Sequence, residues 1–170
     1  SRLRELLKFK KGSPLKLVAA EVIGVDSSSY FKSVFIDKGE KAGIKKDMGV
    51  ISPSGIVGRI LKVADSSSMV LLLIDQNFAL DALVQRTRSG GVVAGFEEGL
   101  CKMKYVLPSE DIRSGDLVVA SGLEGVFPKG MIIGKIISIK KNKLFAFQDV
   151  LVRPMVEFGK LEEVFVVMDK

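Results

Sequence analysis

Five aspartates raise the question of acid–base chemistry, because each lies close to residues that could modify its carboxylate. They are Asp37, Asp47, Asp75, Asp81 and Asp116. Paired carboxylates act as general acid and general base when their surroundings move their pKa values apart. Most of the five, however, stand beside glycine, serine or asparagine, where an aspartate bonds to the backbone N–H groups of a turn. We therefore expect turn-forming roles and no catalytic carboxylate.

Composition narrows the remaining mechanisms. The 170 residues include no histidine and one cysteine, Cys101, so Ser-His-Asp catalysis, Cys-His catalysis and His-containing metal sites are excluded. Lys102 and Lys104 could lower the pKa of the Cys101 thiol. In a strand they would point away from it, so we expect a buried, structural thiol. We expect no enzyme activity, no cofactor and no metal.

Basic residues beside aromatic ones indicate a different class of function. Lys140-Lys141-Asn142-Lys143 is followed by Phe145 and Phe147, and the net charge is +6. On a small β-barrel this pattern could bind single-stranded nucleic acid, as in OB-folds. We favour a solvated lysine loop with both rings in the core, because glutamates interrupt any continuous positive stripe. A nucleic-acid-binding barrel is kept as the alternative.

The elements that must position these residues are short strands. Apolar runs rich in β-branched residues recur at a spacing of roughly 8–15 residues with turns between them, which is typical of a sandwich or a barrel. Residues 1–11 instead have a helical pattern. In this segment Leu3, Leu6 and Leu7 could pair two helices as the end of a coiled coil, or the helix could cap the first sheet.

Two stretches resemble each other and suggest an internal repeat. Gly58 lies in Ile56-Val57-Gly58-Arg59-Ile60, and Gly134, 76 residues later, lies in Ile132-Ile133-Gly134-Lys135-Ile136. The similarity indicates two related β units, although chance is an alternative for so short a pattern. We predict an all-β fold of two small six-stranded β-barrels packed together, preceded by the end of a coiled-coil helix.

Strand counting gives the expected domain boundaries. We assign residues 1–12 to the end of the coiled-coil helix, residues 13–54 and 131–170 to the first barrel, and residues 55–130 to an inserted second barrel. Two sequential domains divided near Gly90 are the competing arrangement.

In order along the chain, a set of short motifs resembles the extracytoplasmic portion of the rod shape-determining protein MreC family. The motifs are Val22-Ile23-Gly24, Ile36-Asp37-Lys38-Gly39, Ala42-Gly43-Ile44, Gly55-Ile56-Val57-Gly58-Arg59-Ile60, Leu72-Leu73-Ile74-Asp75, Gln85-Arg86-Thr87-Arg88, the stretch from Gly115 to Leu123, and Phe127-Pro128-Lys129-Gly130. Each motif alone is weak, but their order and number make the match specific.

The resemblance implies a non-enzymatic scaffold of the bacterial cell-elongation machinery that maintains rod cell shape. The family links the MreB cytoskeleton and MreD to penicillin-binding proteins and RodA, and it forms dimers or filaments. The resemblance also implies that this part of the protein lies on the periplasmic side of the inner membrane. A transmembrane helix would provide the anchor, and it is absent from these residues. No nucleic acid is expected as a partner.

A scaffold binds its partners through surface side chains, so exposed aromatic residues are candidates. The candidates for contacting partners are Phe127 and, if their rings lie outside the core, Phe145 and Phe147. The strand from Leu161 to Met168 could instead offer an open edge for strand addition.

Overall fold

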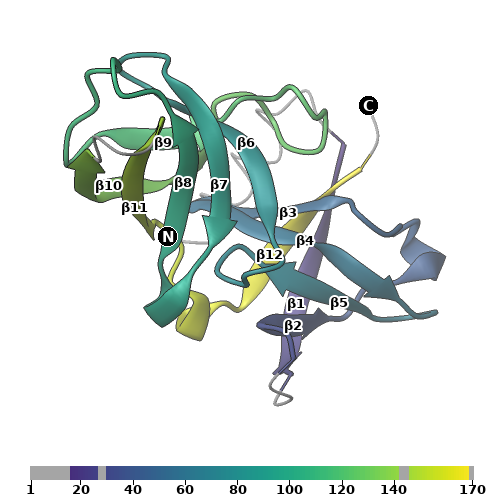
Figure 1. Ribbon diagram of the computed structural model, residues 1–170. Coiled ribbons are helices and arrows are strands. Elements are labelled where there is room, and N and C mark those ends of the chain that lie inside the picture. Colours follow the sequence, from purple (N-terminus) through teal and green to yellow (C-terminus); the bar gives the residue numbers. More distant parts are fainter. Residues whose placement is uncertain (1–15, 27–29, 142–145, 169–170) are drawn as a thin grey trace.

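The computed structural model describes residues 16–26, 30–141 and 146–168, whose strands close into two antiparallel barrels lying side by side (Figure 1). The first barrel contains β1 (Leu17–Val25), β2 (Ser33–Ile36), β3 (Gly49–Ser52), β4 (Gly55–Val63), β5 (Ser68–Leu72) and β12 (Glu163–Val167). The second contains β6 (Ala79–Val84), β7 (Gly90–Gly95), β8 (Cys101–Val106), β9 (Leu117–Ala120), β10 (Ile132–Lys141) and β11 (Gln148–Pro154).

Three short 3₁₀ helices complete the described secondary structure. They are η1 (Glu40–Ala42), η2 (Glu97–Gly99) and η3 (Phe158–Lys160). Among the described residues, no helix has the length and apolar character needed to cross a membrane. The predicted coiled-coil helix at residues 1–12 lies outside the described residues.

The two six-stranded barrels confirm the predicted fold class, but the predicted boundaries are wrong. Strands β4 and β5, within 55–130, close the first barrel, whereas β10 and β11, within 131–170, belong to the second. Hairpin pairing is the reason. Only Pro53 and Ser54 separate β3 from β4, and these strands form one antiparallel ladder, which a boundary at residue 54 would cut. A division near Gly90 is also wrong, because Gly90 begins β7 inside the second barrel.

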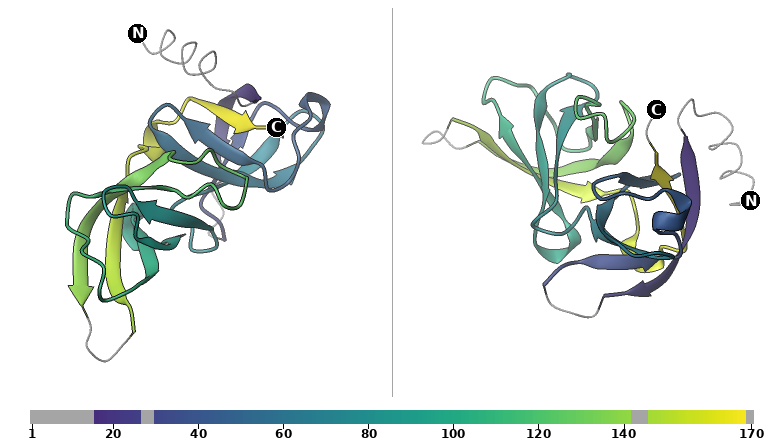
Figure 2. Two further views of the ribbon diagram at one scale, coloured as in Figure 1. Left: turned by 90° about the horizontal axis from the view of Figure 1, so that it is seen from above. Right: turned by 90° about the vertical axis from the view of Figure 1, so that its right-hand side faces the viewer.

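The second barrel is inserted between the fifth and the last strand of the first. After β5 the chain builds all of the second barrel, and it then returns as β12, which lies between β1 and β3 (Figure 2). Strand β12 is thus paired on both sides. The proposed open edge at Leu161–Met168 is therefore wrong for the paired part of that segment, because a closed barrel has no free edge there.

Side-chain alternation fixes what each strand buries. In β11, Val150 and Val152 are buried while Asp149 and Arg153 are exposed, which is the two-residue period of a strand with one face on a core. The main apolar core continues from one barrel into the other: Leu73 and Phe165 belong to the same buried cluster as Met103 and Val150. The barrels therefore share part of their core.

The suspected repeat is visible in the strand ladders. In β4 the register shifts at Val57 and Leu61, and in β10 it shifts at Ile133 and Ile137, each 76 residues later. A bulge adds twist and bends its strand. Two bulges at matching positions of two barrels are a specific similarity, which supports two related units over chance.

Each of these bulged strands needs a glycine at the same point. A Cβ atom on Gly58 would lie 1.9 Å from the Leu71 carbonyl oxygen, and one on Gly134 would lie 2.1 Å from the Arg153 carbonyl oxygen. Both distances are far below van der Waals contact, and both obstacles are backbone atoms of the neighbouring strand. Neither position can hold a side chain unless the ladder moves.

We predict that Gly134→Ala lowers the free energy of unfolding by roughly 1–3 kcal/mol, the usual cost of forcing atoms into a packed interior. Urea denaturation followed by circular dichroism measures this loss. Gly159→Ala is the control, since a Cβ there meets nothing within 4 Å. Equal stability of Gly134→Ala and the parent protein would contradict the steric account.

Candidate functional site

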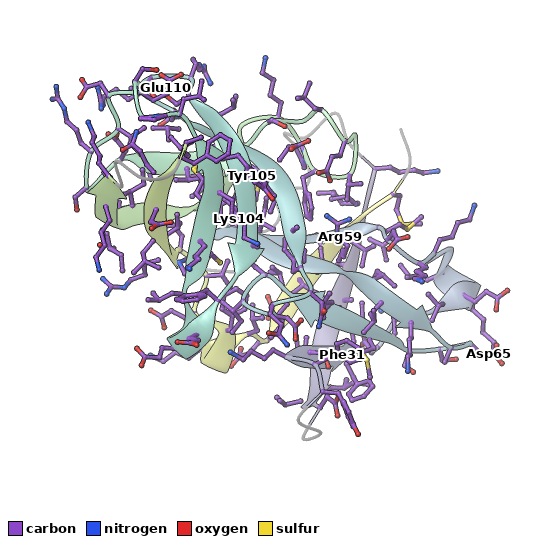
Figure 3. All side chains as sticks on the ribbon, in the orientation of Figure 1. Phe31, Arg59, Asp65, Lys104, Tyr105 and Glu110 are labelled. Atoms are coloured by element: carbon purple, nitrogen blue, oxygen red, sulfur yellow. The ribbon has the colours of Figure 1, made fainter. Side chains whose placement is uncertain are left out.

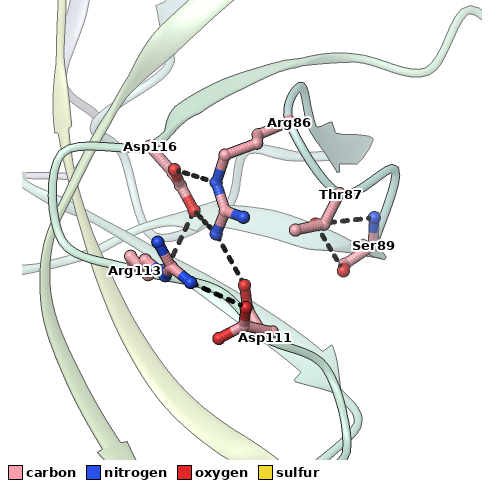
Figure 4. A network of polar contacts seen from close by, with 6 residues as sticks. All are labelled: Arg86, Thr87, Ser89, Asp111, Arg113 and Asp116. Atoms are coloured by element: carbon pink, nitrogen blue, oxygen red, sulfur yellow. Dashed lines mark hydrogen bonds and ion pairs between the residues drawn. The ribbon is translucent and has the colours of Figure 1, made fainter.

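Among the described residues, an ion pair between Arg86 and Asp116 is the centre of a polar network in the second barrel (Figure 4). Nε and Nη2 of Arg86 donate to the two carboxylate oxygens of Asp116 at 2.9 and 3.0 Å, and Nη2 also donates to the Asp111 carbonyl oxygen at 2.6 Å. The backbone N–H of Arg113 donates to Asp116 at 2.8 Å. This network ties the β6–β7 turn to the loop before β9.

The same contacts set the ionisation of the pair. Hydrogen bonding from Arg86 holds the pKa of Asp116 below its ordinary value. Burial opposes this shift, and the Arg113 N–H adds to it. The hydrogen bond to Asp116 likewise raises the pKa of Arg86. A carboxylate held ionised by two arginines is a poor proton donor or acceptor near neutral pH. The network is structural.

The other polar clusters are also occupied by structural contacts. The carboxylate of Asp75 is buried and accepts the N–H groups of Lys32 and Asn77, each at 2.7 Å. The buried Ser89 hydroxyl donates to Glu110 at 2.9 Å. In the described parts of the chain, no cluster of acidic or cysteine side chains could hold a metal ion.

Cys101 is a buried thiol, as predicted. Burial raises its pKa to about 12, and its Sγ lies 3.7 Å from the Leu73 carbonyl oxygen. Lys104 points outward and Lys102 stacks on the Phe96 ring at 4.3 Å, so neither side chain activates the thiol. The thiolate is the reactive form, and this site disfavours it.

Phe127, the first of the residues expected at an exposed partner surface, is instead buried. Its ring is 5% exposed and packs against Phe78 with centroids 6.3 Å apart. The Arg59 guanidinium lies over both rings, at 5.0 Å from Phe78 and 5.9 Å from Phe127. Arg59 comes from β4 of the first barrel, so Phe127 lies at the interface between the two barrels.

The remaining predicted residues fall into two groups. Phe145, Leu3, Leu6 and Leu7 lie outside the described residues. Phe147 is 38% exposed, so this ring is not enclosed in the core.

The lysines near the first turn region, Lys45 and Lys46, line two hollows of about 260 and 380 Å³. Neither hollow has an aromatic side chain in its lining, so neither offers a ring on which a base could stack.

A bulge in β8 creates the most unusual surface of the second barrel. Val106 pairs with Gln148 and Met103 pairs with Val150, which leaves Lys104 and Tyr105 opposite a single β11 residue. Tyr105 adopts a left-handed backbone with φ of 67°. Such a conformation in a bulky residue costs on the order of 1–3 kcal/mol, and strained residues of this kind tend to cluster at functional sites.

Neighbouring residues hold this conformation in place. Gly91 on β7 leaves room, since a Cβ there would lie 2.7 Å from the Lys104 carbonyl oxygen. The buried Gln148 amide donates to the carbonyl oxygens of Leu107 at 2.8 Å and Glu110 at 3.1 Å, bracing the turn after β8. Residues on both neighbouring strands, β7 and β11, therefore hold the strained backbone of β8 in place.

The bulge leaves the side chain of Tyr105 on the surface of the second barrel (Figure 3). Tyr105 is 57% exposed, Leu107 is 51% exposed, and the Phe147 ring meets Tyr105 edge-on with centroids 5.4 Å apart. We call Tyr105, Leu107 and Phe147 the Tyr105 surface. Lys104 and Lys141 are exposed and adjacent to it in the strand pairing.

Sequence reasoning missed Tyr105 and Leu107. Strand alternation places Tyr105 on the same face as Cys101 and Met103, and both of these are buried. The bulge reverses that direction, and a bulge depends on the partner strand. The sequence indicated an exposed Phe147 as one possibility, but it did not predict that Tyr105 and Leu107 would be exposed beside it.

We predict that Asp116→Asn lowers stability at pH 7 and that the loss is smaller in acid. A carboxyl whose pKa is lowered by folding stabilises the protein above its unfolded pKa of about 3.9, and this contribution is lost as pH falls through the lower folded pKa. Chemical denaturation at pH 7 and pH 3 measures the difference. Asp111→Asn, at an exposed side chain that pairs with Arg113, should have a smaller effect. A loss of equal size at both pH values would contradict the ion-pair account.

Comparisons with known proteins place this architecture in a family. The family model of the rod shape-determining protein MreC, barrel core, matches residues 22–168. The cell shape-determining protein MreC of Escherichia coli is 35% identical over 167 residues, covering 95% of this chain and 44% of that protein. The chain thus spans about half the length of the curated relatives it matches.

Solved structures agree with the sequence match. MreC from Pseudomonas aeruginosa superposes with a TM-score of 0.85 at 28% identity, covering 90% of this chain and 99% of that one. MreC in a complex with penicillin-binding protein PBP2 from Helicobacter pylori shares the fold, with a TM-score of 0.72 at 17% identity over 91% of this chain and all of that one. With the two fused barrels, the paired bulges and the family match over most of its length, this chain belongs to the MreC family of cell shape-determining proteins.

Proposed function

We propose that this chain is the extracytoplasmic part of a non-enzymatic scaffold of the bacterial cell-elongation machinery. It binds penicillin-binding proteins and links them to MreD, RodA and, indirectly, the MreB cytoskeleton, and in this way it maintains rod shape. It works on the periplasmic side of the cytoplasmic membrane, and a transmembrane helix outside these 170 residues provides the anchor.

Family membership over residues 22–168 is the observation that carries this proposal. The H. pylori relative in complex with PBP2 supports a penicillin-binding protein as partner. The described side chains add a physical argument. The polar clusters serve as ties between loops and strands, and the two barrels share a core, which suits a rigid platform better than a reaction site.

We predict that the purified chain binds the extracytoplasmic domain of a penicillin-binding protein from the same cell, measured by biolayer interferometry. A partner contact held by apolar groups should weaken only modestly as salt rises. A single-stranded oligonucleotide is the control, because a nucleic-acid-binding barrel would lose affinity steeply between about 50 and 200 mM salt. Failure to retain the enzyme, together with salt-sensitive oligonucleotide binding, would favour the alternative function.

We also propose that Leu3, Leu6 and Leu7 pair two copies through a coiled coil. Apolar side chains at this spacing form the seam of such a pair, and 11 residues alone are too few for a stable isolated helix. Sedimentation equilibrium should show a concentration-dependent dimer that the triple substitution to serine abolishes. A dimer that survives the substitution would place the self-contact elsewhere.

A further inference from the structure

We propose that the Tyr105 surface is a docking site for an acidic, apolar segment of a partner protein. The identification of that partner as a penicillin-binding protein rests on the proposed function. The docking site itself rests on three features of the second barrel: a strained tyrosine, a rigid aromatic pair and a positive rim.

The first feature is the conformation of Tyr105. A glycine or asparagine would adopt a φ of 67° more easily than tyrosine does. Regular alternation would also have buried the ring, whereas the bulge in β8 displays it. Bulges commonly re-aim a side chain next to a functional site. An unfavourable backbone conformation and an exposed ring therefore coincide at Tyr105.

The second feature is the packing of the exposed rings. Tyr105 and Phe147 meet at an interplanar angle of 82°, the favoured edge-to-face geometry. Each ring limits the rotation of the other, so a partner that binds them has little side-chain freedom to remove. Together with Leu107 they give three adjacent exposed apolar groups, and tyrosine is enriched among residues that dominate binding energy.

Charge around the rings selects the partner. Lys104 precedes Tyr105, Lys141 pairs across from Gln148, and Lys140 pairs across from Asp149. All three lysines are exposed, and Asp149 is the one exposed acidic residue in these pairings. The rim is positive, so it attracts an acidic segment and disfavours a basic one.

Tyr105→Gly separates a docking role from a structural one. Glycine accepts the left-handed backbone without strain and removes the ring. A docking role predicts a melting temperature equal to or above that of the parent and affinity for the penicillin-binding protein domain at least about tenfold weaker, as expected for a central interface tyrosine. Phe147→Ser should weaken binding similarly. If the glycine variant folds poorly, Tyr105→Asn replaces it in the same measurement, because asparagine also tolerates the left-handed backbone.

Charge reversal tests the rim, and a distant tyrosine provides the control. Lys104→Glu combined with Lys141→Glu should slow association and weaken affinity several-fold, with the largest difference at low salt. Tyr30→Ala removes an 81% exposed ring of the first barrel and should leave affinity unchanged.

Two outcomes would overturn the inference. One is unchanged affinity in Tyr105→Gly and Phe147→Ser while the parent binds. The other is a single-stranded DNA 20-mer that binds the parent and is lost from both variants, which would make the surface a base-stacking platform. If the parent binds no penicillin-binding protein domain at all, the proposed function fails instead.

Discussion

Arg59 makes a polar and stacking contact that joins the two barrels beside their shared core. It leaves β4 of the first barrel and reaches the second, where its guanidinium lies over Phe78 and Phe127, donates to the Ala79 carbonyl oxygen at 2.8 Å and pairs with Glu124 at 3.5 Å. Arginine suits this position because its flat, permanently charged group can stack on rings and bond in its own plane at once. Lysine could not make the same set of contacts.

The two barrels are similar units used differently. Lys135 of β10 corresponds to Arg59 in the repeat, yet it is exposed. Loop length explains the difference. In the first barrel the turn between β3 and β4 is short, whereas the β9–β10 connection carries Glu124 and Phe127 onto the Arg59 side chain. One repeat therefore provides the arginine, and the other provides the residues that the arginine contacts.

Close packing around β8 explains how the strained backbone of Tyr105 persists. A strained backbone survives only where its surroundings determine it, and here Gly91 on one side and the buried Gln148 on the other leave little alternative. The Arg86–Asp116 pair holds loops at one end of the same barrel. Stability supplied by these contacts allows one surface to keep an unfavourable conformation.

The sequence alone determined the fold class, because alternation, turn residues and strand spacing are local properties. It also excluded imidazole chemistry, since a chain without histidine has none, and its ordered motifs were enough to indicate the family. Only the tertiary structure decided which strands close which barrel, that Phe127 lies under Arg59, and that Tyr105 faces outward. Barrel closure and bulges depend on pairing between strands far apart in the chain, so no local pattern at Tyr105 or Phe127 could reveal their surroundings.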